Sequence, residues 1–366
     1  MKFLIKKEDM LKELQLLQGI VEKRNTMPIL ANILIRASEE ELEITGTDLE
    51  VGMKTHFPAS IEETGSITIS GKKVFEIVKS LRDGVDIMFK DAGQSKMLIT
   101  AGASEFKVVC LPEEDYPQIP QPKFEKKILL PLEKTKEMID RVFYVITQEQ
   151  RYYLNGALMI IKDGSLEFVS TDGHRLAYTS LIVENTNIEN EIRGIVSKKT
   201  LSELRKFDDD KVEFDLDENN LFFKVKNRTI VSRMIEGKFP NFEAVIPKEN
   251  PNTLTASTDE LEDAVRRVSL LSTERSRGIK FNIGKNQIML FSSNPEIGEA
   301  KDQVEAEYNG DGLEIGFNSQ YLLDFLGAVK SEKVCIELKD ENSAVLMRPE
   351  LEDDIKYVYV LMPMKI

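Results

Sequence analysis

The sequence predicts an α+β protein of three similar domains, each with two helices packed on antiparallel strands. One observation is a pair ending in proline that recurs with both intervals equal to 123 residues: Tyr116-Pro117, Phe239-Pro240 and Met362-Pro363. Another is a polar pair that follows a strand-like run, at intervals of 124 and 122 residues: Thr47-Asp48, Thr171-Asp172 and Ser293-Asn294. Because the two landmarks share one register, they predict an internal triplication, and function should depend on how the three units are arranged.

Chain length and proline content place the domain boundaries. A chain of 366 residues is long for one hydrophobic core, whereas three units of about 120 residues have an ordinary domain size. Prolines crowd two junctions: Pro112, Pro117, Pro120 and Pro122 in the first, and Pro240, Pro247 and Pro251 in the second. Since proline keeps the backbone extended and stops a strand from continuing, we predict domains at residues 1–126, 127–252 and 253–366.

Two helices are expected in each domain. The first helix of each has apolar residues at spacings of three and four: Glu8–Glu22, Leu132–Ile146 and Asp259–Leu271. The third of these begins with a capping box, in which Ser257 caps the helix and Glu260 follows three residues later. A second helix is expected after a turn in every domain: Lys72–Leu81, Lys198–Phe207 and Ser319–Val329.

The remaining apolar runs predict antiparallel strands. Two runs precede each polar pair: Ile29–Arg36 with Leu42–Thr45, Ala157–Ile161 with Leu166–Ser170, and Ile279–Ile283 with Ile288–Ser292. Three more runs close each domain, and the short polar spacers between them, such as Asp217–Asn220, favour hairpins over crossovers. The segment Met1–Lys7 lacks the apolar core of a secretory signal, so we expect a first strand there and a cytoplasmic protein.

Composition is that of an ordinary globular protein, with 41% hydrophobic and 31% charged residues and no apolar run long enough to cross a membrane. Cys110 and Cys335 lie in alternating apolar runs, so two buried free thiols are expected; a disulfide between them is the alternative. Two histidines without a cysteine cluster give no zinc site, and no cofactor is expected.

The net charge of −14 argues against a surface covered by nucleic acid, but a local basic surface remains open. Cations cluster in the second helices of the first two domains: Lys72, Lys73, Lys79 and Arg82, and Lys198, Lys199, Arg205 and Lys206. A charged helix face is usually just solvated, yet recurrence in two repeats favours a shared role. Without a base-reading motif, contacts to nucleic acid would be to the phosphate backbone and independent of base sequence.

Catalysis has one candidate, the run Ser170–Arg175, in which Asp172 lies two residues before His174. Such a pair suggests acid–base chemistry, but Asp and Gly also form tight turns, and the matching place in the first domain, Thr47–Glu50, has no histidine. No phosphate-binding loop, nucleophile elbow or metal set accompanies the pair. A turn is therefore the preferred interpretation, and an enzyme is the alternative.

Several blocks of sequence resemble the bacterial DNA sliding clamp family, the beta subunit of DNA polymerase III: Arg151–Gly156, Thr171–Ala177 and Tyr359–Ile366, with Met1–Phe3, Met27–Leu30 and Gly46–Glu50. The resemblance covers the whole chain. It implies the DNA clamp fold and a head-to-tail homodimer, a ring of six similar domains with helices around the hole. Such a ring encircles duplex DNA and tethers the polymerase, without an active site of its own.

The resemblance also implies a pocket between the second and third domains for short linear motifs of the polymerase III alpha subunit, the clamp loader and other clamp-binding proteins. Its residues here are Leu154, Thr171, Gly173, His174, Arg175, Leu176, Pro240, Val245, Tyr321, Val360, Met362, Pro363 and Met364. An apolar site with flexible methionines suits varied peptides. Ala244 stands where some members carry Arg, and Lys365-Ile366 replaces a commoner Arg-Leu ending, so the fine peptide preference stays open.

Contacts to DNA are implied by motif position for Arg24, Gln148, Tyr152 and Tyr153, and charge and repeat position add Lys72, Lys73, Lys198 and Lys199. The dimer contact is expected to join the strand of Phe106 and Val108 to a second copy near Leu270 and Leu271. A monomeric repeat scaffold that binds only proteins remains the alternative to a ring.

Overall fold

The computed structural model describes residues 1–21, 27–39, 41–124, 127–148, 152–162, 164–184, 190–351 and 353–366. These form two compact units, one of residues 1–133 with 199–234 and the other of residues 134–198 with 235–366. Each unit holds part of the predicted second domain, and the domain boundaries expected at residues 126 and 252 stay a prediction. None of the helices in these ranges has the length and hydrophobicity of a bilayer span.

The first unit contains one antiparallel sheet with the strand order β10-β15-β16-β17-β4-β3-β2-β6-β9-β8-β7-β1-β5. Its strands are β1 (Lys2–Lys6), β2 (Asn32–Ala37), β3 (Glu41–Thr47), β4 (Val51–Pro58), β5 (Ser60–Glu63), β6 (Gly65–Ser70), β7 (Asp86–Asp91), β8 (Lys96–Ala101), β9 (Ser104–Leu111), β10 (Ile128–Pro131), β15 (Lys211–Leu216), β16 (Asn220–Val225) and β17 (Arg228–Arg233).

The second unit contains another antiparallel sheet, with the order β14-β11-β12-β13-β25-β24-β23-β18-β21-β20-β19-β22. Its strands are β11 (Gly156–Lys162), β12 (Ser165–Thr171), β13 (Arg175–Ile182), β14 (Ile192–Ser197), β18 (Asn252–Ser257), β19 (Gly278–Gly284), β20 (Gln287–Asn294), β21 (Gly298–Tyr308), β22 (Leu313–Asn318), β23 (Lys333–Leu338), β24 (Val345–Pro349) and β25 (Ile355–Leu361).

The triplication is visible in these strands. Three meanders, β2-β3-β4, β11-β12-β13 and β19-β20-β21, repeat along the chain, and β7-β8-β9, β15-β16-β17 and β23-β24-β25 repeat after them. Successive repeats are joined edge to edge: β4 pairs with β17, and β13 pairs with β25. These two junctions continue a sheet from one repeat into the next, and each junction lies inside one unit.

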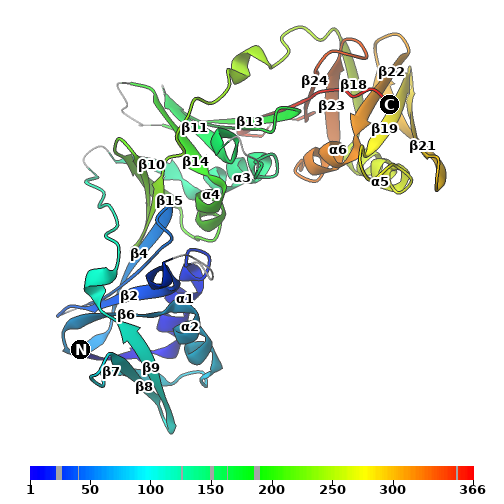
Figure 1. Cartoon of the computed structure of the whole chain (residues 1–366). Helices are drawn as coiled ribbons and strands as arrows, with labels where there is room; N and C mark the ends of the chain where they lie inside the picture. The colour runs from blue at the N-terminus through cyan, green and yellow to red at the C-terminus, as the bar shows by residue number, and fades with distance from the viewer. Residues whose placement is uncertain are drawn as a thin grey trace. The chain divides into compact units, whose positions relative to one another are not determined.

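Six α-helices are assigned in the described ranges: α1 (Lys7–Leu17), α2 (Gly71–Ser80), α3 (Leu132–Phe143), α4 (Lys198–Leu204), α5 (Thr258–Ser269) and α6 (Ser319–Leu326). Figure 1 shows α1 beside α2 in the first unit and α5 beside α6 in the second. The helix α5 is capped as predicted, since the Ser257 hydroxyl accepts a hydrogen bond from the Glu260 N–H at 3.4 Å. Asn318 caps α6 in the same way.

The predicted first helices extend too far at their C-terminal ends. Residues after Phe143 and Ser269 form tight turns instead, with bonds from Val145 N–H to Val142 O at 3.2 Å and from Leu271 N–H to Val268 O at 3.3 Å. Val145 stays buried although the helix has ended, so apolar periodicity continues past the last α-helical turn. The second helices likewise end one to three residues earlier than predicted.

Two strand predictions also need correction. The run Ile29–Arg36 begins with a 3-10 helix, Pro28–Ala31, because the proline fixes a helical φ at its first position, and β2 starts only at Asn32. The predicted set lacks several strands, among them β4 and β13, which form the junctions. Cys110 and Cys335 are buried free thiols, as expected.

A buried ion pair ties α1 to β17 across the first junction. Arg228 donates to both carboxylate oxygens of Glu13, at 2.9 and 2.5 Å, and the Thr55 hydroxyl donates to the same carboxylate at 2.7 Å. Glu13 and Arg228 are both less than a tenth exposed. The two charges lose their hydration on folding, and the hydrogen bonds between them compensate for that loss.

We predict that Glu13→Ala lowers the free energy of unfolding by about 3 kcal/mol, because it leaves the Arg228 charge buried without a partner. Urea denaturation followed by circular dichroism measures the change. Glu76→Gln is the matched control, since Glu76 forms only exposed pairs with Lys72 and Lys73 on α2 and should change stability little. Equal effects of the two substitutions would contradict the assignment.

Candidate functional site

The turn between β12 and β13 is built by side chains that bond to its own backbone. One oxygen of the Asp172 carboxylate accepts from the N–H groups of His174 and Arg175, at 2.9 and 3.0 Å. The Thr171 hydroxyl accepts from Gly173 N–H at 3.1 Å and donates to Arg175 O at 2.7 Å. This arrangement confirms the preferred interpretation of the polar pair as a tight turn.

The first repeat contains the same turn with a different residue at its tip. Asp48 accepts from the N–H groups of Glu50 and Val51 at 2.9 and 2.7 Å, as Asp172 does in the second repeat. Gly173 has a φ of 90°, and Leu49 at the equivalent place has a φ of 78°. Glycine adopts this left-handed conformation without cost, whereas leucine is strained there.

An apolar cluster lies beneath the turn of the second repeat. Leu154, Leu176 and Val360 from the predicted pocket belong to it, together with Phe239 and Phe242 of the linker that follows Ile235. Strand pairing brings Leu176 opposite Val360, because β13 and β25 are neighbours. These three predicted residues are buried, so they form the floor of the site and not its surface.

The C-terminal segment after β25 supplies the more exposed side of the site. Met362 N–H donates to His174 O at 3.0 Å, which continues the pairing of β25 past the end of β13. Met364 N–H donates to Gly316 O at 2.9 Å, and a side chain at Gly316 would collide with that segment. The Met362 and Val245 side chains are 43% and 45% exposed, so each offers apolar surface to a ligand.

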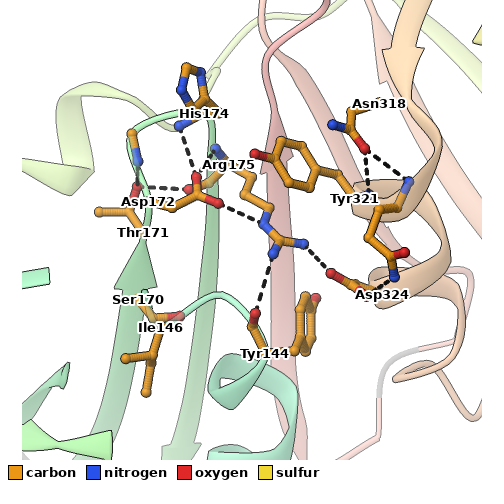
Figure 2. Close-up of polar contacts among 12 residues, drawn as sticks. Tyr144, Ile146, Ser170, Thr171, Asp172, His174, Arg175, Asn318, Tyr321 and Asp324 are labelled. Atoms are coloured by element: carbon orange, nitrogen blue, oxygen red, sulfur yellow. Dashed lines mark hydrogen bonds and ion pairs between the residues drawn. The ribbon is translucent and has the colours of Figure 1, made fainter. Parts of the chain in front are cut away.

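Arg175 is held on every side at the edge of this site (Figure 2). Its Nε donates to Asp172 at 2.9 Å, one terminal nitrogen donates to Asp324 at 2.6 Å, and the other donates to the Tyr144 carbonyl at 3.2 Å. The guanidinium lies 4.1 Å from the centre of the Tyr321 ring. Asp324 was not predicted; its signal was its place on α6 three residues after Tyr321, on one helix face.

The alternative of acid–base catalysis does not fit this geometry. Both oxygens of the Asp172 carboxylate are used, one by two backbone N–H groups and the other by Arg175 Nε. The contact between Asp172 and His174 is to the backbone of the histidine, and the carboxylate does not orient the imidazole.

The predicted DNA-contacting residues differ in how accessible the fold leaves them. Lys72 and Lys73 are exposed on α2, and Gln148 and Tyr152 are exposed in the second unit. Lys198 and Lys199 are instead held by the fold: Lys198 Nζ donates to Ile146 O at 2.7 Å, and Lys199 forms an ion pair with Asp48. Burial lowers the pKa of Lys198. Tyr153 is partly buried against the apolar cluster, and Arg24 lies outside the described residues.

Two strands near the predicted dimer contact have open edges in the described part of the chain: β9, which was predicted, and β21, which packs against α5. The strand β9, with Phe106 and Val108, pairs with β8 along its length and with β6 only at Cys110 and Leu111. Residues 298–305 of β21 pair with β20 alone. Leu270 beside α5 is 75% exposed, and Leu271 is partly buried.

We predict opposite results for matched substitutions at the two turn tips. Gly173→Ala should lower the free energy of unfolding by about 1–2 kcal/mol, because alanine disfavours a positive φ. Leu49→Gly should leave stability unchanged or raise it, because it removes the same strain from the first repeat. Thermal unfolding of both variants checks the sign, and a loss of stability in Leu49→Gly as large as in Gly173→Ala would contradict it.

Comparisons with known proteins agree with this architecture. Models of the DNA polymerase III beta subunit match its N-terminal domain at residues 1–120, its central domain at 129–241 and its C-terminal domain at 243–365. The beta sliding clamp of Pseudomonas aeruginosa is 36% identical, with both chains covered completely. A crystal structure of that organism's subunit has a TM-score of 0.95 at 35% identity over both full chains. Another, a sliding clamp bound to griselimycin, has a TM-score of 0.94 at 36% identity, also over both full chains. The chain therefore belongs to the DNA polymerase III beta subunit family, the beta sliding clamps.

Proposed function

We propose that two copies of this chain form a ring that encircles duplex DNA and tethers the replicative polymerase as a processivity factor. As a beta subunit the chain is a non-catalytic part of the polymerase, and its site of action is the cytoplasm. The observation that carries the proposal is the repeated edge-to-edge pairing of strands between repeats.

The strand order indicates which strands would join two copies into a ring. The meander strands β4, β13 and β21 occupy equivalent places in the three repeats, and so do β9, β17 and β25. Within the chain, β4 pairs with β17 and β13 pairs with β25. This leaves β21 of the third repeat and β9 of the first repeat without such a partner. In the proposed dimer, β21 of each copy pairs with β9 of the other. Such a head-to-tail contact is self-limiting when the ring closes.

Contact with DNA rests on exposed cations that recognise phosphate without reading bases. Lys72 and Lys73 on α2 have side chains that are 58% and 65% exposed, and each forms only a surface pair with Glu76. Such pairs contribute little, so phosphate can replace Glu76 as the lysine partner. We assign Lys198 and Lys199 to holding the fold and leave Lys72, Lys73, Gln148 and Tyr152 as the supported candidates.

We propose that the surface between the β12–β13 turn and Met362 binds short linear motifs of the polymerase III alpha subunit, the clamp loader and other partners. His174, Val245 and Met362 offer exposed side chains over the apolar cluster. Burying one Leu or Phe anchor there should contribute roughly 1.5–3 kcal/mol. Griselimycin, which the Pseudomonas aeruginosa clamp binds in its crystal structure, serves as a probe of this surface.

We predict that the loaded protein stays on nicked circular DNA and is lost from linear DNA of the same length, because a ring slides off a free end. Loading with a clamp loader, followed by gel filtration of both substrates, measures retention. Equal loss from the two substrates would contradict encirclement. A particle that sediments at 41.7 kDa under all conditions would favour the monomeric scaffold instead.

We predict that Lys107→Pro converts the dimer to monomers. Cys110 N–H bonds to Ser95 O on the side of β8, so by strand alternation the Lys107 N–H points toward the open edge of β9. Proline removes this donor without breaking the pairing with β8. Lys107→Ala is the matched control, because it removes the same side chain and keeps the N–H. Analytical ultracentrifugation should show dissociation for proline alone; two dimeric variants would contradict the predicted interface.

We predict that Met362→Ala and His174→Ala each weaken griselimycin binding about fivefold or more, the loss typical of an interface contact worth 1 kcal/mol. Isothermal titration calorimetry measures the affinity. Ile182→Ala is the control, because Ile182 is 84% exposed on the same strand as Arg175 but lies at its other end. Weakening by Ile182→Ala, or unchanged binding in the other two variants, would place the ligand elsewhere.

A further inference from the structure

We propose that Arg175 is a positioning residue that fixes the peptide-binding surface to α6, and that it does not contact the ligand itself. This inference rests on the proposed function of the surface. The resemblance assigns Arg175 to the pocket itself, whereas this inference gives it a positioning role. The inference also adds Asp324, which was not predicted from the sequence.

The donors of Arg175 are already committed within the protein. Three of its nitrogens bond to Asp172, Asp324 and the Tyr144 carbonyl, and the nitrogen on Asp324 also lies 3.5 Å from the Tyr359 hydroxyl. The residue is only 9% exposed. Two carboxylates neutralise its charge, and the Tyr144 and Tyr321 rings lie within 5.5 Å of the guanidinium. A ligand carboxylate could bind Arg175 only by displacing Asp172 or Asp324. The displaced aspartate would then keep its charge without a partner.

What Arg175 holds is the turn that carries His174. Asp172 shapes this turn through two backbone N–H groups and binds Arg175 with its other oxygen. On the far side, Asp324 accepts from Arg175 and from the Gln320 amide at 2.8 Å (Figure 2). His174 O in turn accepts from Met362 N–H, so the turn and the exposed methionine move together. The pair between Arg175 and Asp324 therefore sets the distance between the turn and helix α6.

The first junction supports this assignment because it has the same connection with the charges arranged differently. Asp48 occupies the place of Asp172 and forms an ion pair with Lys199 on α4, the helix equivalent to α6. Val51 stands where the second repeat has Arg175. In both junctions the turn between the second and third strands of the meander is tied to the second helix of the next repeat. The cation comes from the helix in the first junction and from the turn in the second.

The test uses the full-length protein, griselimycin as the probe, and the variants Arg175→Lys, Asp324→Asn and their combination. Lysine keeps the charge but cannot span two carboxylates in the planar geometry of arginine. We expect Arg175→Lys and Asp324→Asn each to weaken griselimycin binding about tenfold, within the range of measured couplings between sites. The double variant should bind griselimycin as tightly as either single variant, because both substitutions break the same contact. Unchanged binding in Asp324→Asn would show that its pair with Arg175 does not position the surface, and additive losses would show that the two residues act independently; either result overturns the proposal.

A matched control separates positioning from general loss of stability. Buried Arg141 on α3 forms a second ion pair, with Asp353 at 3.2 Å, whose side chain is 46% exposed, and also donates to Ile355 O at 2.9 Å. Neither residue belongs to the surface around His174. Asp353→Asn should therefore lower the melting temperature and leave griselimycin affinity unchanged. If it weakens binding as much as Asp324→Asn does, the effect is one of stability alone and the proposal fails.

A second readout needs no ligand. The chain has two histidines, His56 and His174, and His56 lies in β4 of the other unit. Asp324→Asn should shift the imidazole proton signal of His174 in the nuclear magnetic resonance spectrum and leave that of His56 in place, whereas Asp353→Asn should shift neither. An unmoved His174 signal would overturn the positioning role. Absence of griselimycin binding to the unaltered protein would count against the proposed function only.

Discussion

Strand pairing between repeats is the interaction on which the rest of this structure depends. The pairs β4–β17 and β13–β25 connect segments far apart in sequence, and each continues one sheet through a junction. Backbone bonds of this kind demand a fixed distance and direction, so a repeat can join the next in one way only. The side-chain contacts around each junction, including the Glu13–Arg228 pair and the Arg175 contacts, reinforce that geometry.

The repeats share this framework but use it for different ends. The turn between the second and third meander strands has the same backbone bonds in the first and second repeats, yet Leu49 occupies the tip of one and Gly173 the tip of the other. Gly173 carries no side chain at the tip of its turn, and the apolar cluster with Leu176 follows directly in the chain, whereas in the first repeat Ile119 packs over Gly52, where a side chain would collide with it. The same scaffold thus carries the proposed peptide-binding surface at one junction and a packed contact at the other.

The sequence predicts much of this fold because its strongest signals are local or periodic. Apolar spacing locates the first helix of each repeat, a second helix is expected after a turn, and the recurring proline and polar pairs reveal the triplication before any contact is known. The helix ends are less predictable, since Val145 and Leu271 keep the apolar period in tight turns. Of the four junction strands, β17 and β25 were predicted, whereas β4 and β13 were missed. Their pairing across the junctions is with distant segments, and nothing in a local window of sequence specifies an edge partner.

The candidate site was also predicted only in part. Leu154, Leu176 and Val360 were predicted by resemblance and are gathered in one cluster, whereas Phe242 and Asp324 were not predicted. Charge alone could not distinguish exposed Lys72 from Lys198, whose ammonium bonds to a carbonyl inside the fold. Whether a cation is available for a ligand depends on the partners that tertiary structure brings to it, and this information is absent from a count of charges.

The open edges of β9 and β21 have a consequence for the life of a newly made chain. A bare strand edge is a template for any other extended segment, and natural proteins usually blunt such edges with charge, proline or a covering loop. Glu105 and Lys107 on β9 and Glu299 and Lys301 on β21 place charges of both signs along these edges. In the proposed dimer β9 of one copy pairs with β21 of the other, so neither edge can be blocked completely. Charges that complement the edge of the second copy and repel unrelated strands would limit aggregation of the monomer before the proposed dimer forms.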